Sequence, residues 1–131
     1  MITVTPIELL AEDERGTTYI FDSDRTGEFL IAYRKAGSVS GRHYHKGISA
    51  NKNPEKLILM SGEITINWFH VNGVEKGTLK AKAPSWIIIE ANAWHEVIAD
   101  TDFVMYELNS RADGNRDTYR DIPPPPKGEI L

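Results

Sequence analysis

Two histidines separated by one residue, His43 and His45, lie in the stretch GRHYHKGISANKNPE at residues 41–55, which ends in Glu55. Successive side chains of a β-strand point to opposite faces, so the two imidazoles would share one face. Their Cα atoms would lie roughly 6.5 Å apart, and both rings could then reach one ion or one substrate. An isolated pair of this kind also occurs on half-exposed strands, where both rings are simply solvated.

A third histidine and the glutamate favour a site over that simpler interpretation. His95 stands at the start of a late strand, in EANAWHEVIAD, and Glu55 opens the apolar run EKLILMS. A carboxylate at the head of an apolar strand is costly to bury unpaired, and a ligand or partner would remove the cost. We therefore expect His43, His45 and His95 to converge on one centre, with Glu55 as its fourth member.

The elements that must position these residues are β-strands. Runs rich in β-branched and aromatic residues predict nine strands, punctuated by Gly, Asn, Asp, Pro or Ser. They cover residues 17–21, 28–35, 41–46, 55–61, 63–71, 74–81, 85–90, 95–99 and 102–108. Ser61-Gly62 and Asn72-Gly73 predict tight hairpin turns, and only residues 6–13 could begin a helix. An antiparallel all-β barrel or sandwich follows.

The remaining segments are a loop and a tail. Residues 46–54, KGISANKNP, combine breakers with no apolar alternation, so we expect an excursion at the mouth of the barrel that could form a lid or pocket wall. Residues 118–131 form a proline-rich tail, in which four consecutive prolines favour a polyproline II course. A chain of 131 residues is about the size of one domain.

Composition excludes several classes of function. The chain is 40% hydrophobic and has no run of about 18 apolar residues, so we expect a soluble protein without membrane contact. No secretory or transit signal opens it, which predicts a cytoplasmic location. Without cysteines, a metal could bind only to His and carboxylates. A net charge of −4 with scattered Lys and Arg gives no nucleic-acid surface.

The motif around the first two histidines resembles the first cupin motif. Gly37, five residues, His43-x-His45, a spacer, Glu55, six residues and Gly62 follow one another in the cupin order. The spacer has nine residues here, where cupins commonly have three or four. EANAWHEVIAD resembles the second cupin motif, with residues 90–92 in place of the usual Pro-x-Gly turn.

The resemblance covers roughly residues 15–110 and implies a double-stranded β-helix, or jelly roll, with three His and one Glu on its inner face. DERG at 13–16, GRHYHK at 41–46 and DTYRDIP at 117–123 are similar to the sugar-modifying cupins. These include nucleotide-sugar 3,5-epimerases, 3,4-ketoisomerases and the cupin domains of capsular polysaccharide enzymes. The resemblance implies a small polar or carbohydrate-type substrate.

Three hypotheses for the centre stay open. A divalent metal (Zn, Mn, Fe, Co or Ni) could bind to His43, His45, Glu55 and His95 and support oxidation or isomerisation, and this is the hypothesis we favour. Without metal, His43 and His45 could act as general bases on a nucleotide-linked keto-sugar, as the resemblance implies, with Tyr33 or Tyr106 returning a proton. A catalytically silent cupin could instead bind a small ligand. We also expect a homodimer, because open sheet edges need cover.

Overall fold

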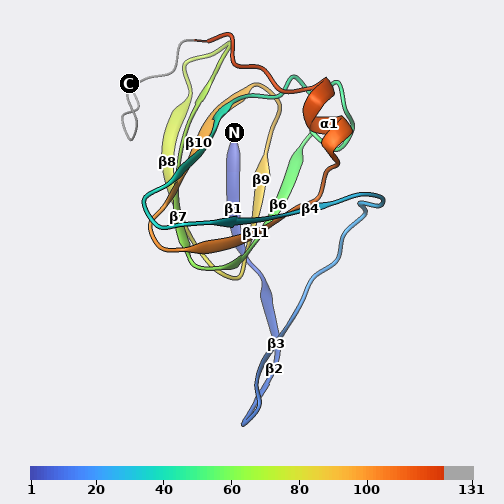
Figure 1. The fold of residues 1–131 in the computed structure, drawn as a ribbon, viewed down its shortest axis with the longest axis vertical. Coiled ribbons are helices and arrows are strands. Elements are labelled where there is room, and N and C mark those ends of the chain that lie inside the picture. The colour runs from blue at the N-terminus through green and yellow to red at the C-terminus, as the bar shows by residue number, and fades with distance from the viewer. Residues whose placement is uncertain (123–131) are drawn as a thin grey trace.

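The computed structural model describes residues 1–122, so the predicted polyproline segment lies outside the described residues. Within that range the chain forms eleven strands and one short helix (Figure 1). The strands are β1 (Ile2–Pro6), β2 (Glu8–Asp13), β3 (Gly16–Ile20), β4 (Leu30–Arg34), β5 (Val39–His43), β6 (Glu55–Ser61), β7 (Glu63–His70), β8 (Lys76–Lys82), β9 (Ser85–Ile89), β10 (Ala93–Ala99) and β11 (Phe103–Glu107). The helix is α1 (Arg111–Arg116). It has six residues, so no helix of the described chain could cross a membrane.

Nine strands form two sheets that close around a common interior. One sheet has the order β1-β9-β6-β11-β4 and the other the order β5-β10-β7-β8, with antiparallel neighbours throughout. The predicted all-β antiparallel jelly roll is therefore confirmed. β1 joins the first sheet although it precedes residue 15, where the cupin resemblance begins.

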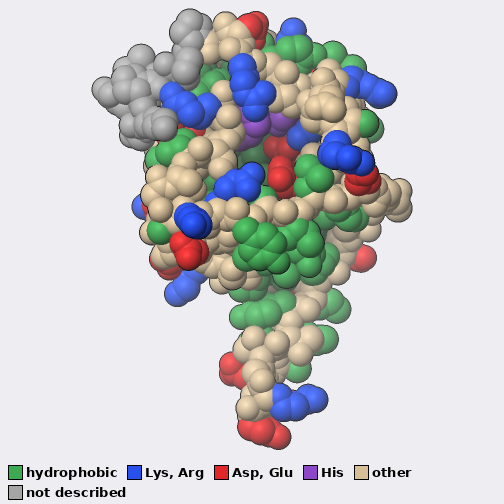
Figure 2. All heavy atoms as spheres, in the orientation of Figure 1, with side chains coloured by type: hydrophobic (Ala, Val, Ile, Leu, Met, Phe, Trp, Pro, Cys, Tyr) green, Lys and Arg blue, Asp and Glu red, His purple; other side chains and the backbone are tan. Residues whose placement is uncertain are grey.

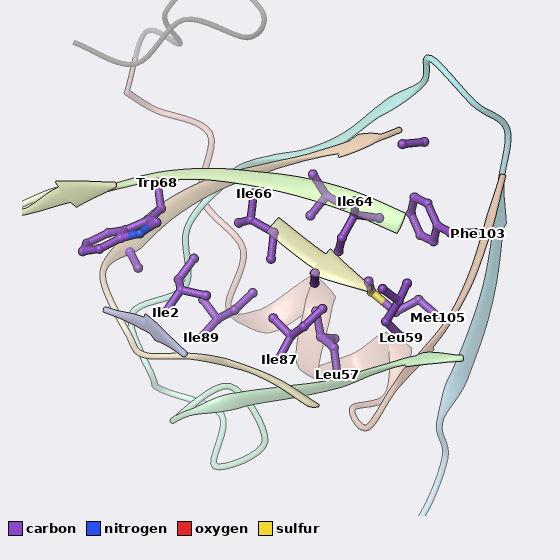
Figure 3. Close-up of a cluster of buried hydrophobic side chains, with 14 residues drawn as sticks. Ile2, Leu57, Leu59, Ile64, Ile66, Trp68, Ile87, Ile89, Phe103 and Met105 are labelled. Atoms are coloured by element: carbon purple, nitrogen blue, oxygen red, sulfur yellow. The ribbon is translucent and has the colours of Figure 1, made fainter. Parts of the chain in front are cut away.

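The core lies between the two sheets and follows the alternation of the strands. Leu57 and Leu59 of β6 point inward beside Ile87 and Ile89 of β9, and meet side chains of β7 and β11 (Figure 3). Ile58 has the opposite parity and packs outside, in a second cluster with Ile7 and Leu108. Burying an aliphatic side chain of this size contributes about 1.5–3 kcal/mol. Both faces of the β6 sheet are thus apolar.

Two local predictions were wrong. Residues 6–13 begin no helix, because β1 ends at Pro6 and β2 follows at once. The helix lies instead at residues 111–116, where Ser110 and Asp113 form a capping box. Ser61-Gly62 is no hairpin, since β6 and β7 belong to different sheets. Gly62 has φ +90°, and a Cβ there would lie 2.1 Å from the Asp102 carbonyl oxygen, so only glycine fits this crossing.

The hairpin of β2 and β3 leaves the barrel as a projecting arm, seen at the bottom of Figure 1. Every residue of both strands is exposed. A two-stranded hairpin is marginally stable in water by itself. Within the described residues the arm therefore has no packing on either face to stabilise it.

Candidate functional site

The structure brings the three predicted histidines together. β5 and β10 are neighbours, and their register places His43 opposite His95, while His45 lies just beyond the end of β5. The ring centroid of His43 lies 4.8 Å from that of His45 and 4.9 Å from that of His95. The His45 and His95 centroids are 5.5 Å apart. One substrate carbon or one ion could reach all three rings.

A bulge in β5 sets this convergence. The pairing of β5 with β10 changes register between His95 and Glu96. At the bulge Gly41 and Arg42 both adopt positive φ, +80° and +60° respectively. A Cβ on Gly41 would lie 3.0 Å from the His95 carbonyl oxygen, so glycine permits the close approach of the two strands. Arg42 points to the opposite side, where it pairs with Glu96 and lies over Trp94. The bulge thus directs the Arg42 guanidinium away from the histidine cluster and the His43 ring toward it.

Glu55 completes the cluster from the facing sheet. Its Oε1 lies 3.3 Å from His45 Nε2 and 3.8 Å from His95 Nε2. Its Oε2 accepts hydrogen bonds from Lys52 Nζ at 2.5 Å and from Asn109 Nδ2 at 3.3 Å. Glu55 and Lys52 are both almost fully buried. The carboxylate therefore has a cation as partner before any ligand arrives.

Hydrogen bonds fix the tautomers of two rings. A carbonyl oxygen can only accept, so Nδ1 of His45 donates to the Asp117 carbonyl oxygen at 2.7 Å, and Nδ1 of His95 donates to that of Ala93 at 2.8 Å. In both rings Nε2 then faces Glu55. His45 Nε2 is buried and has no hydrogen-bond partner.

The third ring has the other arrangement. A guanidinium can only donate, so Nδ1 of His43, 3.1 Å from Arg120 Nη2, is an acceptor. A neutral His43 then carries its hydrogen on Nε2. His43 is also the least buried of the three histidines, which makes it the ring most accessible to a bound molecule.

The environment keeps His43 and His95 neutral and Glu55 charged. Burial, with the neighbouring rings of His95 and His45, lowers the pKa of His43 to about 2. Burial lowers the pKa of His95 to about 4 against the opposing charge of Glu55. Burial alone would raise the pKa of Glu55, but His45 and Lys52 hold it below its usual range. At neutral pH, His43 and His95 are therefore uncharged, and each has a ring nitrogen with a free electron pair.

The histidines could also hold a metal ion, but the predicted four-ligand set is incomplete. One nitrogen from each of His43, His45 and His95 lies within 4.8 Å of the others, and within residues 1–122 this is the only such group. Glu55 is not part of it, and its Oε2 is engaged by Lys52. One oxygen of the carboxylate that would complete an N₃O set is therefore held by an ammonium, while its Oε1 faces the Nε2 atoms of His45 and His95.

The cluster lies at the floor of a cavity of about 510 Å³. Figure 2 shows the histidines inside a hollow of the barrel, with acidic side chains beside them and Lys and Arg around the opening. Arg34, Arg111 and Arg120 line this cavity, together with Lys52. Burial and the nearby Glu55 raise the pKa of Glu107, which also lines it. The cavity combines a histidine floor with a cationic wall.

Sequence reasoning missed the residues that hold the site from a distance. The loop at 46–54 contains no strand beyond a single bridge at Lys52, as predicted, and Lys52 lines the cavity. Asp117 is fully buried, and its carboxylate accepts hydrogen bonds from the loop nitrogens of Lys46, Gly47 and Ser49 at 2.9, 3.0 and 3.1 Å. The chain after α1, just before the predicted tail, thus forms a strap that holds the loop beside the site.

The two tyrosines considered as proton donors lie elsewhere. Tyr33 is 72% exposed, and Tyr106 packs against the outer cluster around Ile58. Neither lines the cavity. The fourth histidine, His70, is half-buried at the end of β7, where its Nδ1 accepts from the Asn72 N–H. It is not part of the cluster.

No protein-family model and no curated protein matches this chain. Solved structures do. The 3,4-ketoisomerase QdtA from Thermoanaerobacterium thermosaccharolyticum has a TM-score of 0.71 and 17% identity, with 92% of this chain and 87% of that chain covered. The dTDP-4-dehydrorhamnose 3,5-epimerase from Sulfolobus tokodaii has a TM-score of 0.61 and 16% identity, with coverage of 82% and 68%.

A third similar structure belongs to a larger protein. The capsular polysaccharide assembling protein CapF from Staphylococcus aureus has a TM-score of 0.56 and 25% identity, and the match covers 87% of this chain but 34% of that one. These likenesses show that the chain has the jelly-roll fold of the cupins, as its motifs predict.

Proposed function

We propose that this chain is an isomerase or epimerase that acts on a nucleotide-linked keto-sugar, with His43 as the proton acceptor. The observation that carries the proposal is the cluster of three imidazoles at the floor of an open cavity. Two of them have a lowered pKa and are neutral at neutral pH. A neutral imidazole is the form that a general base requires.

The chemistry needs a base and a cationic environment. The base removes a proton from the carbon beside the ketone, and the electron pair of that C–H bond forms an enolate. The accepting atom is Nδ1 of His43, which becomes free when Arg120 turns from it toward the negative oxygen that it and Lys52 could stabilise. In isomerisation the imidazolium returns the proton to the former ketone carbon, while the hydroxyl proton of the deprotonated carbon passes to the former ketone oxygen, so that the ketone and the hydroxyl exchange places. In epimerisation water supplies a proton to the opposite face of the same carbon, and the imidazolium gives its proton to solvent.

His45 and His95 have supporting parts in this proposal. The neighbouring rings of His95 and His45 help to lower the pKa of His43, so that His43 is unprotonated before a substrate binds. The Asp117 carbonyl fixes the ring of His45. We place His45 beside His43 as the second member of the catalytic pair, because its ring is the nearest to that of His43.

The substrate class rests on the cavity and the neighbours. A volume of about 510 Å³ is in the range of small-molecule sites. The three arginines that line the cavity suit a diphosphate, because one guanidinium group can donate hydrogen bonds to two phosphate oxygens at once. The QdtA structures contain TDP-4-keto-6-deoxyglucose and TDP.

The test is proton exchange. Purified protein is incubated with TDP-4-keto-6-deoxyglucose in D₂O, and deuterium in the sugar is followed by mass spectrometry and NMR. We expect wild-type exchange and a loss of about 10²–10⁴-fold in the His43→Gln variant. His70→Gln is the matched control and should exchange at the wild-type rate. A folded wild type that exchanges no proton of any nucleotide-linked keto-sugar tested would refute the proposal.

A metal-containing enzyme is the second candidate, favoured by one observation. His45 Nε2 is buried without a hydrogen-bond partner and lies within the group of three imidazoles. A bound Zn, Mn, Fe, Co or Ni ion would supply Lewis-acid polarisation of a substrate oxygen. Elemental analysis of the purified protein measures whether an ion is present.

We further propose that the arm covers a second copy of the chain. Its exposed apolar residues are Leu9, Leu10, Tyr19 and Ile20. The outer face of β4, an edge strand of the five-stranded sheet, exposes Ile31 and Tyr33. In a two-fold dimer each arm would cover the β4 face of the other copy, and both apolar surfaces would leave water together.

Analytical ultracentrifugation tests the dimer. We expect wild type to sediment as a dimer and Leu10→Asp to shift it toward monomer. Val74 is the most exposed apolar side chain of the described residues and lies in the β7–β8 loop, so Val74→Asp is the matched control and should stay dimeric. A monomeric wild type at every concentration tested would contradict this proposal.

A further inference from the structure

The centre already contains a cation of its own, the ammonium of Lys52. Its Nζ lies 2.5 Å from Glu55 Oε2, and the side chains of both residues are about 95% buried, with 5% and 4% exposed. Lysine is almost never buried to this extent unless it is paired. The pair neutralises the carboxylate at the position where the cupin resemblance places a metal ligand.

The protein holds this lysine from both sides. The Arg25 guanidinium donates to the carbonyl oxygens of Asn51 at 2.7 Å and Pro54 at 2.5 Å, the residues that bracket Lys52 and its neighbour. Nearer the start of the loop, the Asp117 carboxylate accepts three backbone N–H groups. Lys52 is therefore a fixed part of the floor, and the nine-residue spacer supplies the length that these anchors need.

We propose that Lys52 takes the place of a divalent metal: its ammonium occupies Glu55 and so makes the histidine centre discriminate against metal ions. A metal at the three imidazoles would gain a carboxylate ligand, and a full N₃O set, from Glu55. Lys52 and Asn109 hold its Oε2, and Arg120 donates to Nδ1 of His43. Two fixed cations thus engage two of the acceptors that a metal could use, Oε2 of Glu55 and Nδ1 of His43. The inference concerns the cation and does not depend on the reaction proposed above.

The test measures cobalt(II) binding to chelator-treated protein by visible absorption and calorimetry. We expect weak binding to wild type and about 10–100-fold tighter binding to Lys52→Gln, in which Glu55 is free to coordinate. Lys56→Gln is the matched control: it removes the same charge four positions along the chain, from a side chain that pairs outward with Asp24. Its affinity for cobalt should equal that of wild type.

A second variant separates coordination from general electrostatics. In Lys52→Gln/Glu55→Gln the gain in cobalt affinity should disappear, because the carboxylate that provides it is gone. Tight, stoichiometric cobalt binding by wild type would overturn the inference without any variant, and so would a folded Lys52→Gln protein with wild-type affinity. Loss of proton exchange in the sugar assay would leave these affinities unchanged, so the two proposals fail separately.

Discussion

Replacing Asp117 with asparagine tests whether the strap after α1 holds the site together. Asp117 is fully buried, and its two carboxylate oxygens accept three loop N–H groups, Oδ1 from Lys46 and Oδ2 from Gly47 and Ser49. Asparagine keeps one acceptor oxygen and replaces the other with a donor. Whichever way the amide turns, at least one N–H loses its acceptor and the others lose a charged one.

The expected cost follows from these bonds. A hydrogen bond to a charged group contributes about 1.5–3 kcal/mol, and a neutral one about 1 kcal/mol. One bond lost and two weakened predict that Asp117→Asn lowers the free energy of unfolding by about 2–4 kcal/mol. Asp121→Asn is the control, because that exposed carboxylate accepts one bond, from the Tyr44 hydroxyl at 2.8 Å. It should cost about 1 kcal/mol or less.

Urea denaturation followed by circular dichroism measures both values, provided that the slope with urea stays constant. The prediction includes a second readout, because the Asp117 backbone carbonyl also holds His45 and the loop carries Lys52. Binding of TDP, measured by calorimetry, should weaken in Asp117→Asn and not in Asp121→Asn. If the two variants unfold at the same urea concentration, the strap does not anchor the loop and the reasoning is refuted.

Two further predictions concern pH and the chain crossing. His95 has a pKa of about 4 when folded against 6.5 as its ordinary value, so the unfolded chain binds more protons between these pH values and stability falls as pH drops through them. From pH 7 to pH 5 the loss should be about 2 kcal/mol from this residue, and His95→Gln should flatten the urea midpoint against pH. If the urea midpoint depends on pH equally in wild type and in His95→Gln, then His95 is not the source of the pH dependence. Gly62→Ala should lower the melting temperature, since its Cβ would lie 2.1 Å from a carbonyl oxygen, whereas Gly114→Ala, with open space around it in α1, should raise it. A Gly62→Ala protein as stable as wild type would be the refuting result.

The sequence was sufficient for the strands and the histidines, because both depend on local spacing. The apolar run EKLILMS predicted β6, and the His-x-His pair predicted that His43 and His45 would approach one another. Sequence patterning failed for β2, because every residue of that strand is exposed and its apolar and polar residues therefore do not alternate between a buried and an exposed face.

The partners of the histidines were invisible for a different reason. Asp117 lies 72 residues beyond His45, and Asn109 lies 54 beyond Glu55, so no spacing rule connects them. Lys52 lies in a segment whose Gly, Pro and Asn residues predict a loop, and a lysine in a loop is usually solvated. DTYRDIP at 117–123 is similar to a segment of the sugar-modifying cupins, but only the folded chain shows that Asp117 anchors the loop.

The long spacer between His45 and Glu55 then has a physical explanation. Glu55 heads β6 in one sheet and His45 follows β5 in the other. Because their side chains nevertheless lie close together, a short spacer would be enough to join the two residues. The extra residues carry Lys52 to the Glu55 carboxylate and present three N–H groups to Asp117. Because each residue closed in a loop costs little additional entropy, these ionic contacts can offset the added length. The departure from the usual cupin spacing is therefore where this chain places a cation beside its histidines.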